Sequence, residues 1–235
     1  EHKPFIAVVN EYQTNIYQNY ENIKSMQNEI LEHADHIWIS SELSRSMLKG
    51  KNILESKIFK MLYSIDENFY KFSSQKRHKF RQYVKLDENV FLALVYDDFI
   101  EHTTAINTLL ALHKLKTSTP NLWENFKLLF IGNGPLVKEI KYKAYDLGIS
   151  HNILFMNEIP LNIINDLYSA SDIIIDLNIN NSYTHEAYPF FVLEALGCGV
   201  YPVVSHISPI AELIDSNSGT IIMDESWIYL SSAFK

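Results

Sequence analysis

Short apolar runs rich in β-forming residues alternate along this chain with longer stretches of helical periodicity, and this alternation constrains the fold most. The runs predicted as strands are Phe5–Val9, His36–Ser40, Val90–Val95, Lys127–Ile131, Asp172–Leu177 and Tyr201–Ser205. Runs such as Ile173–Ile175 are apolar without alternation, as expected when helices cover both faces of a sheet. The pattern therefore predicts an α/β fold, a Rossmann-like parallel sheet with helices on both faces.

One helix has readable limits. After Pro135, apolar residues recur at helical spacing, and Gly148 follows them as a C-terminal cap. The residues of this face are Leu136, Val137, Ile140, Ala144 and Leu147. The sequence predicts a helix that ends just before Gly148.

The length of 235 residues corresponds to between one and two domains at about 150 residues per domain. The polar stretch 66–89 separates a first group of strands and helices from a second group that begins at Val90, and we place the domain junction there. Glycine use supports the division, because Gly50 is the only glycine before Gly132.

Composition excludes several classes of protein. The formal net charge of -8 argues against a nucleic-acid binder with a broad basic face. No apolar run approaches the ~18 residues of a membrane span, and no signal peptide is readable at the start. The single cysteine, Cys198, cannot form an intrachain disulfide or a cysteine-based metal cluster, which fits a reducing compartment. We expect a globular cytoplasmic protein.

Two segments could carry chemistry. The first is the turn Ile131–Pro135, which would let backbone N–H groups face a ligand at the carboxyl end of a strand. It lacks the third glycine of a dinucleotide fingerprint and the Gly-Lys-Ser/Thr of a P-loop, so the alternative is a simple tight turn. Gly132 is the candidate binding residue in it.

The second segment runs from Glu186 to Glu194, with a helix predicted to begin near Pro189. Proline is favourable at a first helical position, and the N–H groups of Phe190 and Phe191 would then face the same space as Glu186. A helix N-terminus attracts anions, and two carboxylates can accept hydrogen bonds from sugar hydroxyls. The combination suits a nucleotide-linked sugar. The alternative is that Glu186 helps to cap the helix and Glu194 is a solvated helix residue.

Several passages, in order, resemble the C-terminal domain of family 4 (group 1) glycosyltransferases, retaining enzymes of the two-domain GT-B architecture. They are Leu129–Pro135, Leu147–Ile149 with Asn152–Phe155, Leu167–Asp172, the E-x7-E segment Glu186–Glu194, and Glu212–Ile214 with Gly219. Upstream, Ala34–Glu42 resembles the last strand of the N-terminal domain and Tyr63–Phe69 resembles the interdomain segment, with Ser64 in place of a glycine.

The resemblance implies a domain plan. Residues 1–70 would be the C-terminal part of the acceptor-side domain, 71–89 the interdomain segment, and 90–235 the nucleotide-sugar-binding domain. The N-terminal domain is then only partly present, and we expect a fragment of a longer protein.

The resemblance also implies roles. Glu186 would be the catalytic residue near the reacting carbon of the donor sugar, and Glu194 would hold the ribose hydroxyls. Backbone groups at Tyr188, Pro189, Phe190 and Phe191 would surround the diphosphate, and those at Asn157, Glu158 and Ile159 would read the base. N–H dipoles would stabilise the charge on the leaving diphosphate, so neither a metal nor a cofactor is required.

Two departures bear on activity. Asp97 stands where the family has an arginine, with His102 roughly where it has a lysine, and Pro189 replaces a glycine and removes one N–H. A carboxylate near a diphosphate is repulsive. A protonated His102 would partly compensate.

The preferred hypothesis is a retaining glycosyltransferase of polysaccharide biosynthesis, acting from a nucleotide-sugar on a glycan or lipid-linked acceptor. The alternative is a non-catalytic homologue that serves as a partner or regulatory subunit; a nucleotide-sugar epimerase fits the glutamate pair less well. The basic cluster Lys76–Lys79 with Arg81 leaves open a contact with the inner membrane face, against a solvated helix face. No nucleic-acid partner is expected.

Overall fold

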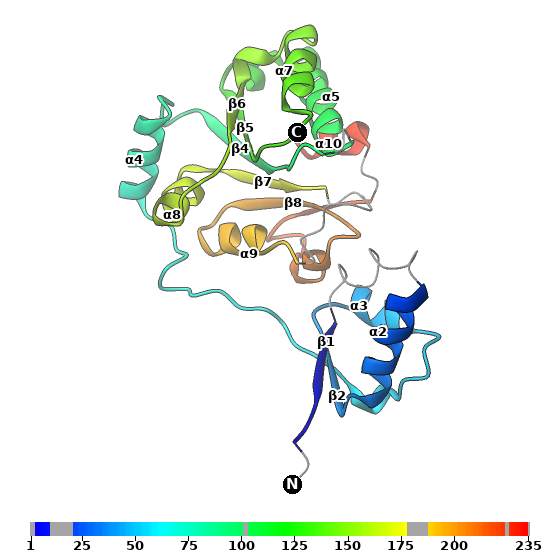
Figure 1. The fold of residues 1–235 in the computed structure, drawn as a ribbon. Coiled ribbons are helices and arrows are strands. Elements are labelled where there is room, and N and C mark those ends of the chain that lie inside the picture. The colour runs from blue at the N-terminus through cyan, green and yellow to red at the C-terminus, as the bar shows by residue number, and fades with distance from the viewer. Residues whose placement is uncertain (1–2, 10–20, 101–102, 178–187, 224–225, 235) are drawn as a thin grey trace. The chain divides into compact units, whose positions relative to one another are not determined.

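The computed structural model describes residues 3–9, 21–100, 103–177, 188–223 and 226–234. The chain forms two compact units that divide between Ser64 and Ile65, with Tyr188 and Pro189 grouped with the first unit. Each unit contains a parallel sheet (Figure 1). The predicted α/β class with parallel sheets is therefore confirmed.

The first unit has a three-stranded sheet in the order β1-β2-β3. Its elements are β1 (Ile6–Val9), α2 (Glu21–His33), β2 (His36–Ile39), α3 (Glu42–Leu48), a 3-10 turn (Glu55–Lys57) and β3 (Ile58–Lys60). One sheet face packs on α2 and α3 through a buried apolar cluster that includes Val9, Leu31 and Ile39. Residues on the other face, such as Val8 and Phe59, are exposed.

The second unit has a six-stranded parallel sheet in the order β6-β5-β4-β7-β8-β9. The strands are β4 (Phe91–Tyr96), β5 (Phe126–Ile131), β6 (Ile153–Met156), β7 (Ile173–Asp176), β8 (Tyr201–Ser205) and β9 (Thr220–Ile222). From β4 the chain adds β5 and β6 toward one edge of the sheet, and from β7 it adds β8 and β9 toward the other edge. The strand order thus reverses between β4 and β7, which is the position where open α/β sheets bind ligands.

Helices cover both faces of this second sheet (Figure 1). They are α4 (Ser74–Tyr83), α5 (Thr103–Ser118), α6 (Pro120–Glu124), α7 (Val137–Asp146), α8 (Leu161–Ala170), α9 (Phe190–Gly197) and α10 (Trp227–Ala233), with 3-10 turns at Ser150–Asn152 and Pro209–Leu213. Alternate residues of the strands, such as Val95 and Ile175, pack on α5, α7 and α10. Helices α8 and α9 lie on the opposite side of the sheet.

All six strands predicted from apolar runs are present within two residues of their predicted ends. The helix predicted after Pro135 is α7, and Gly148 follows it with a φ of +66°. Strand β6 corresponds to the passage that the family resemblance suggested. Strands β3 and β9 have three residues each, too few to show a period.

The expected interdomain segment, residues 71–89, belongs entirely to the second unit. It contains α4, and Ser73 just before that helix donates its N–H to the hydroxyl of Ser169 on α8 at 3.2 Å. The boundary between the compact units lies earlier in the chain, between Ser64 and Ile65. Polarity suggested a linker, but the polar side chains of α4 are used for contacts within the unit.

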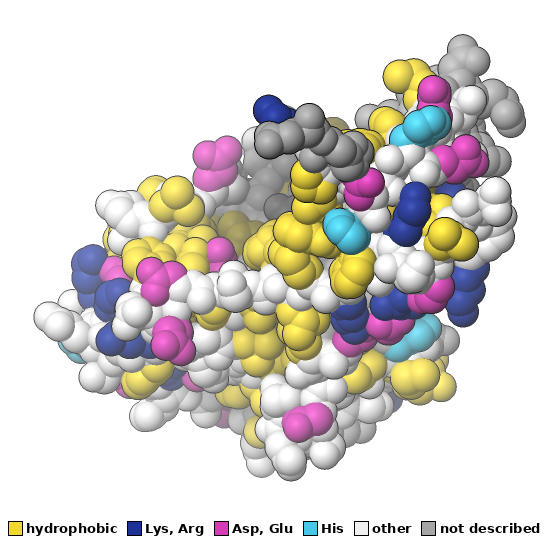
Figure 2. Space-filling view, turned by 90° about the horizontal axis from the view of Figure 1, so that it is seen from below, with side chains coloured by type: hydrophobic (Ala, Val, Ile, Leu, Met, Phe, Trp, Pro, Cys, Tyr) yellow, Lys and Arg dark blue, Asp and Glu magenta, His cyan; other side chains and the backbone are white. Residues whose placement is uncertain are grey.

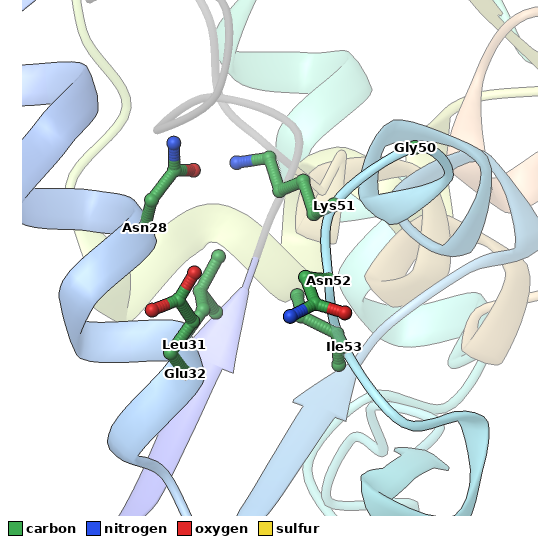
Figure 3. Close-up of a pocket in the computed structure, with 7 residues that line it drawn as sticks. All are labelled: Asn28, Leu31, Glu32, Gly50, Lys51, Asn52 and Ile53. Carbon is green, nitrogen blue, oxygen red and sulfur yellow. The ribbon is translucent and has the colours of Figure 1, made fainter.

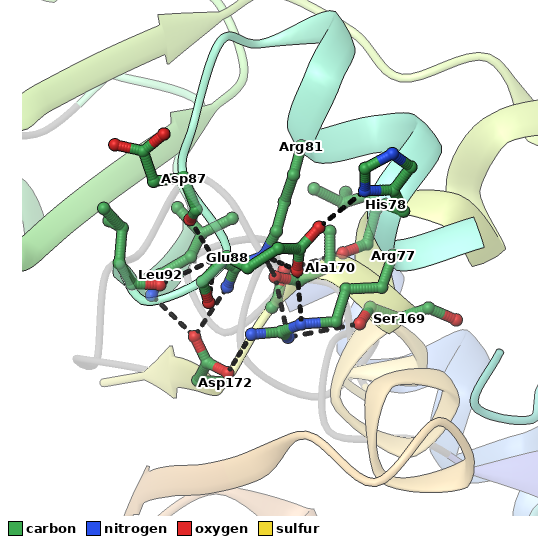
Figure 4. A network of polar contacts seen from close by, with 12 residues as sticks. Arg77, His78, Arg81, Asp87, Glu88, Leu92, Ser169, Ala170 and Asp172 are labelled. Carbon is green, nitrogen blue, oxygen red and sulfur yellow. Dashed lines mark hydrogen bonds and ion pairs between the residues drawn. The ribbon is translucent and has the colours of Figure 1, made fainter. Parts of the chain in front are cut away.

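Arg81 is the central contact of α4 and is fully buried (Figure 4). Its guanidinium donates to the carbonyl oxygens of Ala170, Asp87, Glu88 and Val90, and to the Asp172 carboxylate at 2.9 Å. All three nitrogens of this planar group therefore donate to acceptors, which is the condition for burying its charge.

The other members of the basic cluster also have partners within the unit. Arg77 pairs with Asp172 at 3.0 Å, Lys79 with Asp166 at 2.6 Å, and His78 lies 2.9 Å from Glu88. Lys76 lies over the ring of Phe69. These internal contacts account for the cluster, and a contact with the membrane face stays a prediction.

Basic and acidic side chains lie interspersed on the face drawn in Figure 2. Among the helices of the described residues, none has the length and apolar character needed to cross a bilayer.

Candidate donor-binding site

Glu194 lies in the second turn of α9, the helix predicted to begin near Pro189 and observed to begin at Phe190. Its two carboxylate oxygens have different partners. Oε1 accepts the hydroxyl of Tyr70 at 2.7 Å, and Oε2 accepts the hydroxyl of Tyr168 on α8 at 2.8 Å. The half-buried carboxylate is therefore held from two sides rather than free on a solvated helix.

The two tyrosines remain hydrogen-bond donors over the whole ordinary pH range. Burial, followed by the negative charge of Glu194 and the hydrogen bond to it, raises the pKa of the Tyr70 hydroxyl. Burial and the neighbouring Tyr96 and Glu194 raise the pKa of Tyr168. Tyr96, the last residue of β4, donates to the Tyr168 hydroxyl at 3.4 Å. A chain of hydroxyls thus connects the end of β4 with Glu194.

The first turn of α9 carries two of the predicted donor-binding residues. Phe191 packs its ring against that of Tyr96, with centroids 4.7 Å apart, and Phe190 is 40% exposed. The first N–H groups of a helix have no partner within the helix, so this turn can meet an anion. Tyr188, by contrast, is buried and packs its ring on Tyr63, which makes its side chain a packing residue of the first unit.

Asp97 follows β4 and turns its carboxylate back on its own loop. Oδ1 accepts the N–H of Phe99 at 2.7 Å. Oδ2 is buried and has no hydrogen-bond partner in the part of the chain that the structure describes. Burial raises the pKa of this carboxyl to about 6. Where the family has an arginine, this chain has an acidic residue that shapes the loop.

Gly132 and Gly134 are explained by packing between two loops. A Cβ at Gly132, whose φ is +136°, would lie 1.9 Å from the carbonyl oxygen of Asp97. A Cβ at Gly134 would lie 1.8 Å from that of Asp98. The turn after β5 therefore rests directly on the loop after β4, and this contact alone requires glycine at both positions. A ligand contact of Gly132 is additional to that role and stays a prediction.

The predicted base-reading residues directly follow β6. Asn157 and Glu158 are exposed and Ile159 is half-buried. The N–H of Gly132 donates to the carbonyl of Met156 at 2.9 Å, so the turn after β5 adjoins this strand end. The structure thus brings Asn157 and Gly132 to the same edge of the sheet. Glu186 and His102 lie outside the described residues.

Sequence reasoning missed three side chains at this end of the unit. Tyr168 lies inside a passage that carried the family resemblance and Tyr70 directly follows another, but nothing in their spacing indicated Glu194 as the partner. Asp176, the last residue of β7, accepts the hydroxyl of Ser208 at 2.8 Å, and both side chains are buried. An aspartate at the end of an apolar strand is the signal from which a buried hydrogen bond of Asp176 could have been predicted.

Cys198 is buried, and burial raises the pKa of its thiol to about 11. Its sulfur donates to the side-chain oxygen of Asn165 at 3.4 Å. Within the described ranges, no three His, Cys, Asp or Glu side chains converge as metal ligands would.

The first unit contains a separate cavity of about 280 Å³ between α2 and the loop after α3. Figure 3 shows Asn28 and Lys51 pointing toward one another across it. Leu31 and Ile53 contribute apolar surface, and Oδ1 of Asn28 has no hydrogen-bond partner among the described residues. None of the predicted donor-binding residues lines this cavity.

Comparison with known proteins gives one family match. The family described as "Glycosyl transferases group 1" matches residues 76–235. An uncharacterized glycosyltransferase of Methanocaldococcus jannaschii is 25% identical over 105 residues, which are 45% of this chain and 24% of that protein.

Solved structures share the fold. HepE of Anabaena, in complex with UDP and glucose, superposes with a TM-score of 0.78 at 16% identity over 99% of this chain and 61% of that chain. Sucrose-phosphate synthase of Thermosynechococcus elongatus gives a TM-score of 0.76 at 14% identity, over 99% of this chain and 58% of that chain. The present chain thus spans about three fifths of these proteins.

Proposed function

The chain belongs to the group 1 glycosyl transferases, and from this premise we propose that it moves a sugar from a nucleotide-sugar donor to a glycan or lipid-linked acceptor. We propose further that the reaction retains configuration, as in the family 4 enzymes that the sequence resembles. The observation that carries the proposal is the carboxylate of Glu194, fixed by two hydroxyls in the second turn of α9.

The donor is proposed to lie where the strand order of the second unit reverses. Glu194 would accept the ribose hydroxyls, and the first turn of α9 would face the diphosphate. As the glycosidic bond breaks, negative charge gathers on the leaving nucleoside diphosphate, and the N–H groups of the helix stabilise that charge more in the transition state than in the ground state. Glu186 would act near the reacting carbon, and the helix dipole makes a metal unnecessary.

Structures of Anabaena HepE with UDP and with UDP-glucose favour a uridine nucleotide as the first donor to test. The test is thermal melting of the protein with UDP, UDP-glucose and the corresponding adenine and guanine nucleotides. A ligand at 100 times its dissociation constant adds about 2.7 kcal/mol, which for a chain of this size raises the melting temperature by roughly 5 to 10 °C.

Replacement of Glu194 by alanine tests the site. We expect Glu194→Ala to abolish the shift produced by the bound nucleotide, while the protein without nucleotide stays folded. Glu139→Ala, at an exposed position of α7, is the matched control and should keep the full shift. Equal shifts in the wild type and in Glu194→Ala would show that the nucleotide binds elsewhere.

A second candidate function is a non-catalytic homologue that serves as a partner or regulatory subunit. Two observations favour it: the buried carboxyl of Asp97 at the position of the family's arginine, and Pro189 in place of a glycine. A well-folded protein whose melting temperature responds to none of the nucleotides would support this candidate over the enzyme.

A further inference from the structure

The carboxylate of Glu194 is held by two hydroxyls that come from different elements. Tyr70 lies ahead of α4 and Tyr168 lies on α8, and their oxygens are 2.7 and 2.8 Å from Oε1 and Oε2. Tyr96 at the end of β4 donates in turn to Tyr168. Because each oxygen has its own donor, the carboxylate can neither rotate nor withdraw without losing a hydrogen bond.

Hydrogen-bond capacity remains at this carboxylate. An ionised carboxylate offers about four acceptor directions, and the two tyrosines occupy two of them. As far as the structure describes the chain, two directions therefore stay open, one on each oxygen, which matches the two neighbouring hydroxyls of a ribose. A glutamate side chain that is already held loses less conformational freedom when a ligand binds.

We propose that Tyr70 and Tyr168 are positioning residues that hold Glu194 for a ribose diol and thereby give the site its preference for ribonucleotides over 2′-deoxyribonucleotides. The inference rests on the proposed function and deepens it. A 2′-deoxy nucleotide fills one open direction and leaves the other without a donor, and a site built to receive a hydroxyl rejects ligands that lack it.

Calorimetric titration with UDP and with 2′-deoxy-UDP tests the proposal in the wild type, Tyr70→Phe and Tyr168→Phe. Phenylalanine keeps the ring and its packing and removes only the hydroxyl. We expect the wild type to bind UDP at least about tenfold more tightly than 2′-deoxy-UDP, in line with a hydrogen bond to a charged group. In each variant UDP affinity should fall about fivefold or more, while 2′-deoxy-UDP affinity should fall by a smaller factor, because this nucleotide has only one hydroxyl to place on Glu194.

Tyr201→Phe is the matched control. It removes a tyrosine hydroxyl of the same unit, one that lies 3.0 Å from the hydroxyl of Thr220, and it should leave the preference for UDP unchanged. Melting temperatures without nucleotide report any effect of the substitutions on folding.

Four results would overturn the inference. An equal loss of affinity for both nucleotides means that the tyrosines only support the fold, and tighter UDP binding by the variants means that the hydroxyls compete with the ribose. If Glu194→Ala abolishes UDP binding but neither tyrosine variant alters it, the inference fails and the proposed function stands. A wild type that binds no nucleotide contradicts both.

Discussion

Asp97 stabilises the loop after β4 through one oxygen and destabilises it through the other. Oδ1 accepts the N–H of Phe99, a fully buried residue that has a φ of +52°, in the left-handed region. Oδ2 is buried without a hydrogen-bond partner among the described residues. Burial, together with the like charge of Asp98, raises the pKa of the carboxyl to about 6. The carboxylate that holds the loop in its geometry therefore carries a negative charge that burial disfavours.

The stability of the protein should depend on pH through this group. In the unfolded chain an aspartate has a pKa of about 3.9, so the folded protein binds the proton more tightly. The resulting stabilisation is complete below about pH 4 and is lost as the pH rises through about 6. Asparagine keeps the acceptor for Phe99 without a charge. Asp97→Asn should therefore raise the free energy of unfolding by roughly 1 to 3 kcal/mol at pH 8.

Urea denaturation at pH 5 and pH 8 measures this difference. The gain from Asp97→Asn should be larger at pH 8 than at pH 5. Asp66→Asn is the control, because Asp66 is exposed and its Oδ1 likewise accepts the N–H of the residue two positions on, Asn68. A gain of the same size at both pH values would show that the charge of Asp97 is not the cause.

At the scale of elements, α4 is a polar helix that one buried arginine fixes to the rest of its unit. Arg81 contacts the loop that follows α4, the end of α8 and Asp172 ahead of β7 (Figure 4). A helix with so few apolar residues gains little from hydrophobic burial; its two buried side chains are Phe80 and Arg81. The hydrogen bonds of the guanidinium therefore hold α4 in place, as packing of an apolar face holds other helices.

Arg81→Met should destabilise the second unit by about 3 to 5 kcal/mol, because it removes the donor from the carbonyl groups of Asp87, Glu88 and Val90 and breaks the ion pair with Asp172. The measurement is denaturant unfolding followed by circular dichroism. Lys143→Met is the control: its ammonium lies 3.6 Å from the carboxylate of Asp146 and the two side chains are 39% and 59% exposed, so the loss should stay below about 1 kcal/mol. Similar losses in both variants would contradict the role given to Arg81.

At the scale of the whole molecule, the second unit begins earlier than the polarity of the sequence indicated. Ile65 and Tyr70 already belong to it, and a Cβ at Gly197 would lie 2.4 Å from Cδ1 of Ile65 and 2.9 Å from the carbonyl oxygen of Tyr70. The segment ahead of α4 thus packs against the end of α9. The unit requires residues 65–89 as well as the six-stranded sheet.

Two fragments test this boundary. A fragment of residues 65–235 should unfold cooperatively in urea. A fragment of residues 90–235 should be much less stable or unfolded, because it lacks α4, Arg81 and Tyr70. Equal midpoints and slopes for the two fragments would place the boundary at residue 90 after all.

The sequence predicted the sheet better than the contacts between its parts. Six strands and α7 were readable because periodicity and glycine caps are local signals. Strand β9 was too short for such a signal, and Arg81 resembled a solvated residue because its acceptors Ala170 and Asp172 lie about 90 residues away. Glu194 was found from its motif, whereas its partner Tyr70 lies 124 residues away in the sequence. The topology of the fold brings together residues that are so far apart in the sequence, and the spacing of residues along the chain does not reveal that topology.

The distance along the chain between Arg81 and its partners also sets an order of events during synthesis. Ala170 and Asp172 follow Arg81 by 89 and 91 residues. At about 5 to 20 residues per second, a ribosome completes them roughly 5 to 20 s after Arg81 has been added. For that interval the guanidinium stays hydrated and α4 has no α8 to pack on. The helix that is made first in this unit therefore cannot complete its contacts until α8 and Asp172 have been made.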